Sequence, residues 1–274
     1  DDRPLTLDDV RRLAPAAFTA EPHPETSDQY RPVSTLDAVE VLADHGFAPV
    51  QAAQKKARTI EGNRYAQHLI AFAQDRAEAG ETRPEIVLYN SHDGGSSLKL
   101  FGGAFRFICS NGIVAGDGYE AKARHVGSSV QGVEDMLRDV AGSLPDLMAR
   151  IDRLRGVQID NWHAHRLAAE AASLRWDDLR SAHPEDRRGA FYDAETLRAL
   201  MSPRRPQDAN DRTLWGAFNR VQEGLLRGGV PVRSYTEKSP HGTRRRARPI
   251  GSVEESVRLN RTLWDAAEAM LEAA

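Results

Sequence analysis

Four arginines stand close together near the C-terminal end of the sequence. They are Arg244, Arg245, Arg246 and Arg248, and the segment 227–248 around them contains one acidic residue, Glu237. Guanidinium groups bind phosphate oxygens, and each phosphate they neutralise makes nucleic-acid binding more sensitive to salt. We interpret the cluster as a phosphate-binding surface, against the alternative of a solvated loop that binds nothing in particular.

A second set of basic residues is spread over segments that we expect to lie in or beside strands. The set comprises Lys55, Lys56, Arg58, Arg64, Lys99, Arg106, Lys122 and Arg124. If these segments share one sheet, their side chains could extend a basic track across it. Within this set, the residues predicted to contact nucleic acid are Lys55, Lys56, Arg58, Lys99 and Arg124.

The polar run 90–97 contains residue types that can perform catalysis, namely Ser91, His92 and Asp93, and Cys109 follows later. A nucleophile needs a base within hydrogen-bond reach and a third group that orients the base, and adjacency on a turn does not supply that geometry. A polar hairpin tip and a small core cysteine are the simpler interpretation. We predict no enzyme activity, and a nuclease centred on His92 or Asp93 remains an alternative.

The other patterns typical of bound groups are absent. His163 and His165 are two residues apart, whereas two ligands on one helix normally lie three or four residues apart. Gly94-Gly95 and Gly102-Gly103 match neither a P-loop nor a dinucleotide fingerprint. We therefore predict no metal and no cofactor.

The elements that must position these residues form an α+β pattern. Apolar runs at 86–89 and 98–101 flank the polar run and predict a β-hairpin, and Gly102-Gly103 predicts a tight corner before a short helix. Helices are expected at 6–18, 35–46, 128–176, 194–200, 213–226 and 252–274. Residues 231–249, rich in proline and arginine, are expected to form a mobile surface loop or arm.

This pattern predicts a small antiparallel sheet packed on helices, followed by a mainly helical C-terminal half. The domain boundaries follow: residues 1–30 form an N-terminal helix and connector, 31–127 an α+β core, and 128–274 a helical region with a basic arm around 231–249. No apolar run approaches the roughly 20 residues needed to cross a bilayer. With one cysteine among 274 residues, the expected compartment is the reducing cytoplasm.

Several segments resemble a known family. The stretch NSHDGGSSLKLFGGAFRFICSNGIVAGD, the earlier TLDAVEVLADHGFAPVQAAQ, and the later LWGAFNRVQEGLLRGG, RRRARPI and VRLNRTLW are similar to phage- and plasmid-related proteins grouped as domain-of-unknown-function family 932. The resemblance covers nearly the whole chain and implies a mobile-element setting. It transfers no catalytic residue.

The order of helix, antiparallel strands and glycine-marked helix also resembles single-strand annealing recombinases, which hold a single strand along a basic groove. This resemblance, with the arginine cluster, leads us to expect a homo-oligomer that binds single-stranded DNA without sequence preference and promotes annealing or protects the strand. The alternative is a protein-interaction module that inhibits a host restriction or defence factor. The sequence leaves open the oligomer size, the true partner and the role of residues 90–97.

Overall fold

The chain folds into two compact units, Asp1–Met148 and Ala149–Ala274, each described by itself below. The structure, a computed structural model, describes residues 3–56, 59–74, 83–105, 120–123 and 130–272. The boundary between the units lies inside the long helix α4 (Val130–Gly156), whereas the sequence pattern places a domain boundary between residues 127 and 128.

The first unit is built on an antiparallel sheet of five strands in the order β1-β2-β3-β4-β5. The strands are β1 (Phe47–Gln54), β2 (His68–Gln74), β3 (Arg83–Asn90), β4 (Leu98–Phe105) and β5 (Glu120–Ala123). The predicted hairpin is confirmed, with Val87 opposite Phe101 and Leu88 opposite Leu100. The central strands are buried along most of their described length, so the apolar runs read from the sequence form the core of this unit.

The first unit also contains short helical segments, and the three α-helices among them each have a side-chain cap at the N-terminus. They are α1 (Leu7–Leu13), the 3-10 turn η1 (Pro15–Phe18), α2 (Thr35–Asp44) and α3 (Ile60–Arg64). Thr6 and Asp9 form a reciprocal capping box at α1, and Ser34 caps α2 by accepting from the Asp37 N–H at 3.1 Å. The start of each helix is thus set by the local sequence.

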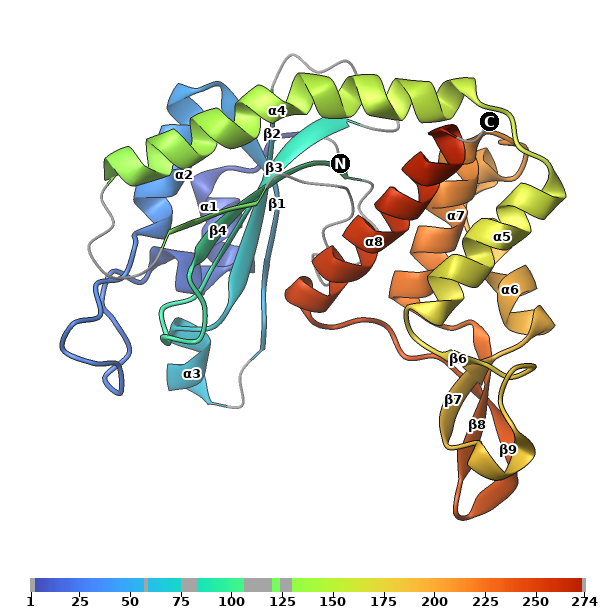
Figure 1. Cartoon of the computed structure of the whole chain (residues 1–274). Helices are drawn as coiled ribbons and strands as arrows, with labels where there is room; N and C mark the ends of the chain where they lie inside the picture. Colours follow the sequence, from blue (N-terminus) through green and yellow to red (C-terminus); the bar gives the residue numbers. More distant parts are fainter. Residues whose placement is uncertain (1–2, 57–58, 75–82, 106–119, 124–129, 273–274) are drawn as a thin grey trace. The chain divides into compact units, whose positions relative to one another are not determined.

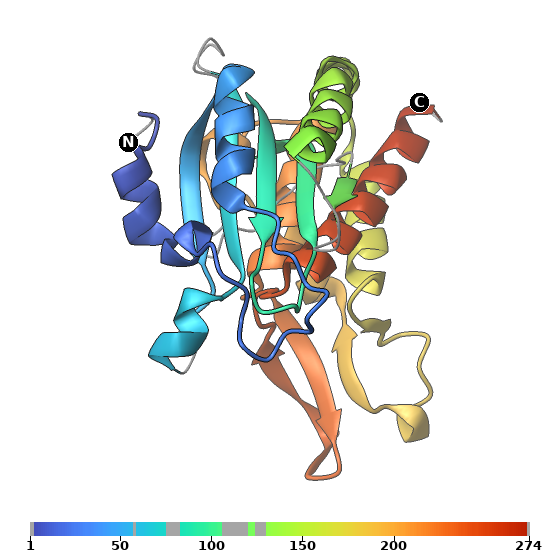
Figure 2. The same cartoon turned by 90° about the vertical axis from the view of Figure 1, so that its left-hand side faces the viewer.

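Helices α2 and α4 lie on the same face of the five-stranded sheet (Figure 2). Thr35 of α2 contacts His68 of β2, and the Val140 and Leu144 side chains of α4 lie over Gly102 of β4. The register places His68 and Gly102 on one face of the sheet, together with Leu88. This face is therefore the one that packs on helices, as the sequence predicts for an α+β core.

The paired glycines do not form the predicted corner. Gly102 and Gly103 lie inside β4, opposite Ile86 and Glu85, and the strand continues to Phe105. A Cβ atom on Gly102 would lie 2.7 Å from Val140 Cγ1, so glycine is needed here because α4 crosses the strand at this point. The helix predicted after the corner falls mainly on residues 106–109, which lie outside the described residues.

The second unit combines four helices with a small sheet (Figure 1). The helices are α5 (Asn161–Ser173), α6 (Ala194–Met201), α7 (Leu214–Arg227) and α8 (Val253–Glu272). The sheet has four strands in the order β6-β7-β8-β9. Its strands are β6 (Asp177–Asp178), β7 (Gly189–Tyr192), β8 (Pro231–Thr236) and β9 (Ser239–Arg246), and the 3-10 turns η2 (Pro184–Asp186) and η3 (Pro206–Asp208) complete the unit.

Three aromatic side chains form the centre of the second unit. Trp215 stacks on Phe218 with ring centroids 5.5 Å apart, and Trp264 of α8 meets both rings edge-on. Buried aromatic side chains contribute strongly to core stability, so α7 and α8 are joined through this cluster. In the portion of the chain described here, no helix combines the length and apolar character needed to cross a membrane.

Candidate nucleic-acid interface

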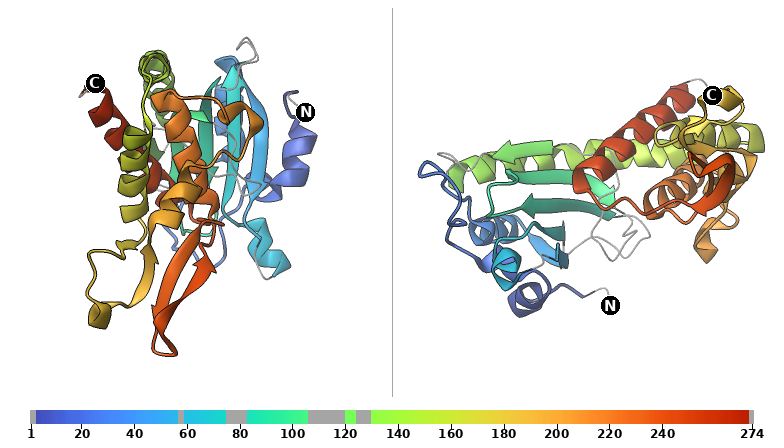
Figure 3. Two further views of the ribbon diagram at one scale, coloured as in Figure 1. Left: turned by 90° about the vertical axis from the view of Figure 1, so that its right-hand side faces the viewer. Right: turned by 90° about the horizontal axis from the view of Figure 1, so that it is seen from below.

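The arginine-rich segment forms a β-hairpin, so of the predicted loop or arm at residues 231–249 the loop is wrong. Strands β8 and β9 pair antiparallel, with Arg233 opposite Arg244 and Val232 opposite Arg245, and residues 237–238 form the turn. Figure 3 shows the hairpin extending from the helices of the second unit. Gly242, at φ +74, lies under the Tyr235 ring, where a Cβ atom would lie 2.6 Å from ring carbon Cζ. Tyr235 in turn packs edge-on against Phe191 of β7, which holds the hairpin to the unit.

Three of the four predicted arginines share one pocket, which we call the arginine pocket. It has a volume of about 530 Å³ and lies between β9 and α6. Its lining residues are Glu195, Arg198, Ala199, Ser202, Pro231, Arg244, Arg245 and Arg246. Four arginines and one glutamate are therefore among the described lining residues, and this excess of positive charge favours an anionic ligand.

Contacts within the chain hold some of these guanidinium groups in place. Arg244 forms an ion pair with Glu195, and its Nη2 lies 3.7 Å from Asp193 Oδ2. Arg246 donates from Nη1 to the Gly229 carbonyl oxygen at 2.7 Å. The Arg245 side chain is exposed and has no hydrogen-bond or ion-pair partner in the described parts of the chain. Arg245 is thus the most available cation of the pocket.

Arg248 lies beyond the hairpin and does not line the arginine pocket. Its side chain is exposed, and its carbonyl oxygen accepts from Arg175 Nη2 at 2.9 Å. Arg175 also donates to the Leu225 carbonyl oxygen, and burial lowers the pKa of its guanidinium. The segment after β9 is therefore tied to α7 through Arg175.

The predicted basic residues of the first unit do not all lie on an exposed surface. Lys55 and Lys56 are exposed at the end of β1 and line a separate pocket. Lys99 is buried at 7% exposure, with its Nζ 5.9 Å from the centre of the Tyr89 ring. Arg58 and Arg124 lie outside the described residues. The structure thus brings Arg244, Arg245 and Arg246 together and leaves the two lysines in the other unit.

The hairpin tip contains a buried polar cluster. Ser91 and His92 are fully buried, and the His68 and His92 rings stack with centroids 5.4 Å apart. Thr35 Oγ1 lies 2.8 Å from His68 Nε2 and 3.4 Å from His92 Nε2. Asn90 donates from Nδ2 to Thr35 Oγ1 at 3.0 Å. These contacts anchor the tip to α2.

The alternative of a nuclease at this tip requires His92 or Asp93 to converge with another titratable group such as His125, and it stays a prediction that these contacts do not test. The Ser91 hydroxyl oxygen has no hydrogen-bond partner among the residues described, so no base is seen beside it. Asp93 is exposed and accepts from the Gly95 N–H at 2.8 Å, a contact typical of a turn. Cys109 and His125 lie outside the described residues.

The histidine pair also shows no metal-site geometry. His163 Nδ1 lies 2.7 Å from Asp160 Oδ1. Asp160 caps the N-terminus of α5 by accepting from the His163 backbone N–H, and this hydrogen bond is the main cause of the lowered pKa of the Asp160 carboxyl. Among the residues whose placement is described, no group of three or more histidine, cysteine, aspartate or glutamate side chains could hold a metal ion.

Sequence reasoning missed two residues of the arginine pocket, Glu195 and Arg198. Both stand on the predicted helix α6, and their polar character there is typical of a solvated helix face. Nothing in the local pattern shows that β9 packs beside this helix.

The fold, with its two α+β units, can now be compared with known proteins. The chain belongs to the family described as Domain of unknown function (DUF932), which matches residues 22–264. It is similar to UPF0380 protein YafZ of Escherichia coli strain K12, with 31% identity over 98% of this chain and 93% of the relative. UPF0380 protein YfjQ of the same strain is 30% identical over the same shares of the two chains. No solved structure matches the chain.

Proposed function

We propose that this protein binds single-stranded DNA through its phosphate groups, without sequence preference, and that it promotes annealing or protects the strand. The observation that supports the proposal is the arginine pocket, whose described lining contains four arginines and one glutamate. Arginine binds phosphate oxygens in a planar, two-pronged geometry and stays charged at any physiological pH.

The shape of the arginine pocket favours a single strand over a duplex. The pocket is concave, with a volume of about 530 Å³, and a hairpin strand forms one wall. A flexible single strand can place one phosphate into such a depression, whereas a duplex presents its phosphates on a stiff convex surface. The lining contains no aromatic side chain on which a base could stack, so this site would contact the backbone and not read bases.

The charges within the pocket set the expected strength of binding. Arg244 is already paired with Glu195, and Arg246 is held by a backbone carbonyl oxygen. We therefore expect about two effective phosphate contacts per protomer and a slope of roughly −1.4 for log K against log salt. Such a modest site is consistent with action as a homo-oligomer, in which several protomers contact one strand. The compartment that fits this role is the cytoplasm.

Fluorescence anisotropy with a labelled single-stranded oligonucleotide tests the proposal at about 50 mM and about 200 mM salt. We expect binding at low salt that weakens as the salt concentration rises. Arg245→Ala should weaken binding about three- to tenfold, because a charge-assisted contact to phosphate is lost.

The matched control is Arg138→Ala, which removes an arginine from the exposed surface of α4 in the first unit, where it pairs with Asp135. This control should leave DNA binding unchanged. Absence of binding by the intact protein at low salt would contradict the proposal. Recovery of a host protein in a pull-down with the intact protein would then favour a protein-interaction module.

A further inference from the structure

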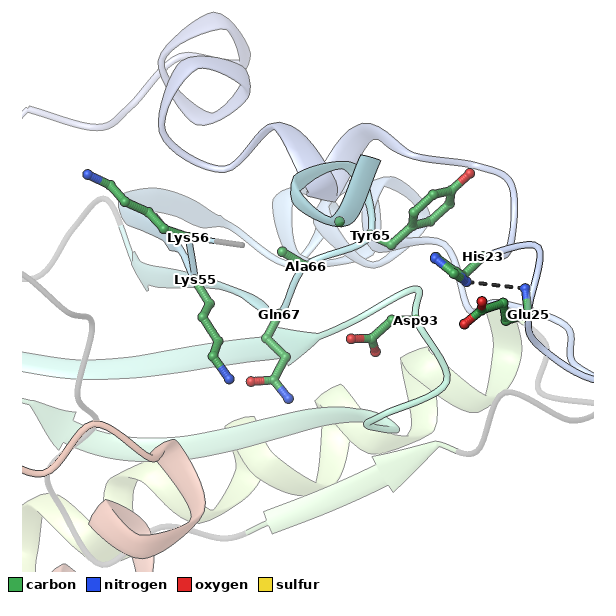
Figure 4. A pocket seen from close by; sticks show the side chains of 9 residues that line it. His23, Glu25, Lys55, Lys56, Tyr65, Ala66, Gln67 and Asp93 are labelled. Carbon is green, nitrogen blue, oxygen red and sulfur yellow. Dashed lines mark hydrogen bonds between the residues drawn. The ribbon is translucent and has the colours of Figure 1, made fainter. Parts of the chain in front are cut away.

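A second pocket lies in the first unit and has a different chemical character. Its volume is about 460 Å³, within the range of pockets that hold small ligands. Its lining residues are His23, Glu25, Lys55, Lys56, Gly62, Tyr65, Ala66, Gln67 and Asp93 (Figure 4). We call it the hairpin-tip pocket, because Asp93 brings the polar run 90–97 into its wall.

The walls of this pocket come from four separate segments of the chain, which are joined by backbone hydrogen bonds. The Lys55 N–H donates to the Gln67 carbonyl oxygen at 2.8 Å, and the His92 N–H donates to the Tyr65 carbonyl oxygen at 3.2 Å. The His23 N–H donates to the His92 carbonyl oxygen at 3.0 Å. The pocket is thus held by the backbone, which reduces the ordering cost of binding a ligand.

The histidine in the wall has a defined orientation. His23 Nδ1 accepts from the Glu25 N–H at 3.2 Å, so the ring carries its proton on Nε2 when it is neutral. The ring packs edge-on against Tyr65, with centroids 4.9 Å apart. Tyr65 itself is 5% exposed, so it supports His23 and offers no open face for stacking. His23 can therefore act as a hydrogen-bond donor to a ligand.

The charges in the hairpin-tip pocket are separated in space. Figure 4 shows Lys55 and Lys56 toward one end and His23 and Glu25 toward the other, with Asp93 and Gln67 between them. Neither lysine and neither carboxylate takes part in an ion pair with another described residue. A ligand that is anionic at one end and rich in N–H donors at the other would complement this arrangement.

We infer that the hairpin-tip pocket binds a nucleoside 5′-monophosphate group, either as a free nucleotide or as the 5′-phosphorylated end of a strand. The phosphate lies at Lys55, because the carboxylates of Glu25 and Asp93 repel it from the other end. The base lies toward these carboxylates, which accept hydrogen bonds from exocyclic amino groups such as the cytosine N4 amine. Bases with an amino group are therefore preferred over uracil. The inference is independent of the arginine pocket, which belongs to the other unit.

Isothermal titration calorimetry of the intact chain with CMP, UMP and cytidine tests this inference. We expect CMP to bind more tightly than UMP, and about tenfold more tightly than cytidine, which lacks the phosphate. Lys55→Ala should weaken CMP binding by about tenfold. Asp93→Asn should reduce the preference for CMP over UMP, and its amide oxygen can still accept from the Gly95 N–H, so the turn is retained.

Two controls separate this site from the arginine pocket. Lys238→Ala removes an exposed lysine from the turn between β8 and β9, and Arg245→Ala removes a cation of the arginine pocket. Lys238→Ala should bind CMP like the unaltered protein, and Arg245→Ala should retain the part of CMP binding that Lys55→Ala removes. A matched pair of oligonucleotides, with and without a 5′-phosphate, then identifies the source of the phosphate. Tighter binding of the 5′-phosphorylated oligonucleotide that is lost in Lys55→Ala indicates a strand end. Equal binding of the two oligonucleotides, with CMP binding intact, indicates a free nucleotide.

Absence of CMP binding at millimolar concentration would overturn the inference. Equal binding by Lys55→Ala would do the same, provided that its thermal unfolding midpoint matches that of the unaltered chain. Loss of CMP binding in Arg245→Ala but not in Lys55→Ala would place the phosphate in the arginine pocket and would also reject the inference.

Discussion

The guanidinium of Arg244 forms an ion pair with the carboxylate of Glu195 across the arginine pocket, and so joins β9 to α6. Glu195 is the one acidic residue in the pocket lining. It orients Arg244 and at the same time competes with any phosphate for it. Under the proposed function, this relationship predicts that Glu195 opposes phosphate binding.

Replacement of Glu195 by glutamine should therefore tighten binding to single-stranded DNA. A charge about 4 Å from the phosphate contributes about 1 kcal/mol in a well-solvated site, so the gain should be about fivefold at low salt. Fluorescence anisotropy measures the change. Glu40→Gln, the same charge change on the exposed face of α2 in the first unit, serves as the control, and equal gains in both variants would indicate a nonspecific charge effect.

Gly102→Ala should destabilise the first unit. The added methyl group would lie 2.7 Å from Val140 Cγ1 and 3.4 Å from the Val140 carbonyl oxygen, so α4 must move away from β4. We expect the free energy of unfolding to fall by about 1–3 kcal/mol. Urea unfolding monitored by circular dichroism measures this loss.

The matched control for this substitution is Gly142→Ala in helix α4, which packs on β4 at Gly102. A Cβ atom on Gly142 has nothing within 4 Å, and alanine is a better helix former than glycine, so we expect a gain of about 0.5–1 kcal/mol. Destabilisation by both variants to the same extent would argue against close packing of α4 on β4.

Glu268→Gln should lower the stability of the second unit in a pH-dependent way. Arg150 donates to Glu268 from two guanidinium nitrogens and lowers the pKa of that carboxyl below its ordinary value of 4.5. A group whose pKa is lowered by folding stabilises the folded state fully above the unfolded-state pKa, and this contribution is lost as the pH falls through the folded-state pKa.

At pH 7 the variant should therefore lose about 1–3 kcal/mol of unfolding free energy. The difference from the unaltered protein should shrink as the pH falls below about 4.5. Thermal unfolding at a series of pH values measures it. Glu272→Gln, at an exposed position of the same helix, is the control, and a pH-independent difference for Glu268→Gln would show that the ion pair is not its cause.

The first unit was largely predictable from the sequence because its signals are local. The alternating apolar residues around Leu88 and Leu100 and the turn residues between them specify a hairpin, and Thr6 and Ser34 mark helix starts. The strand position of Gly102 was not predictable, because the need for glycine comes from Val140, far along the chain. Lys99 was expected on an exposed basic track, but it is buried. This burial was not predictable, because the sequence around β4 does not show which of its side chains other segments cover.

The arginine pocket was predictable only in part. The density of positive charge at Arg244–Arg246 is visible in the sequence, but its β-hairpin is not, because Pro240 and Gly242 interrupt the pattern of a strand. Only two side chains of β8, Val232 and Tyr235, are buried, which leaves little apolar signal. The facing residues Glu195 and Arg198 come from α6, and no local rule links that helix to β9.

The salt dependence of binding to a single-stranded oligonucleotide tests the central claim most directly. For the unaltered protein we predict a slope of roughly −1.4 for log K against log salt, and for Arg245→Ala a slope that is smaller in magnitude by about 0.7, because one phosphate contact is lost. Arg138→Ala should retain the slope of the unaltered protein. Identical slopes for the unaltered protein and Arg245→Ala, or the absence of binding at low salt, would contradict the assignment of the arginine pocket as the phosphate-binding site.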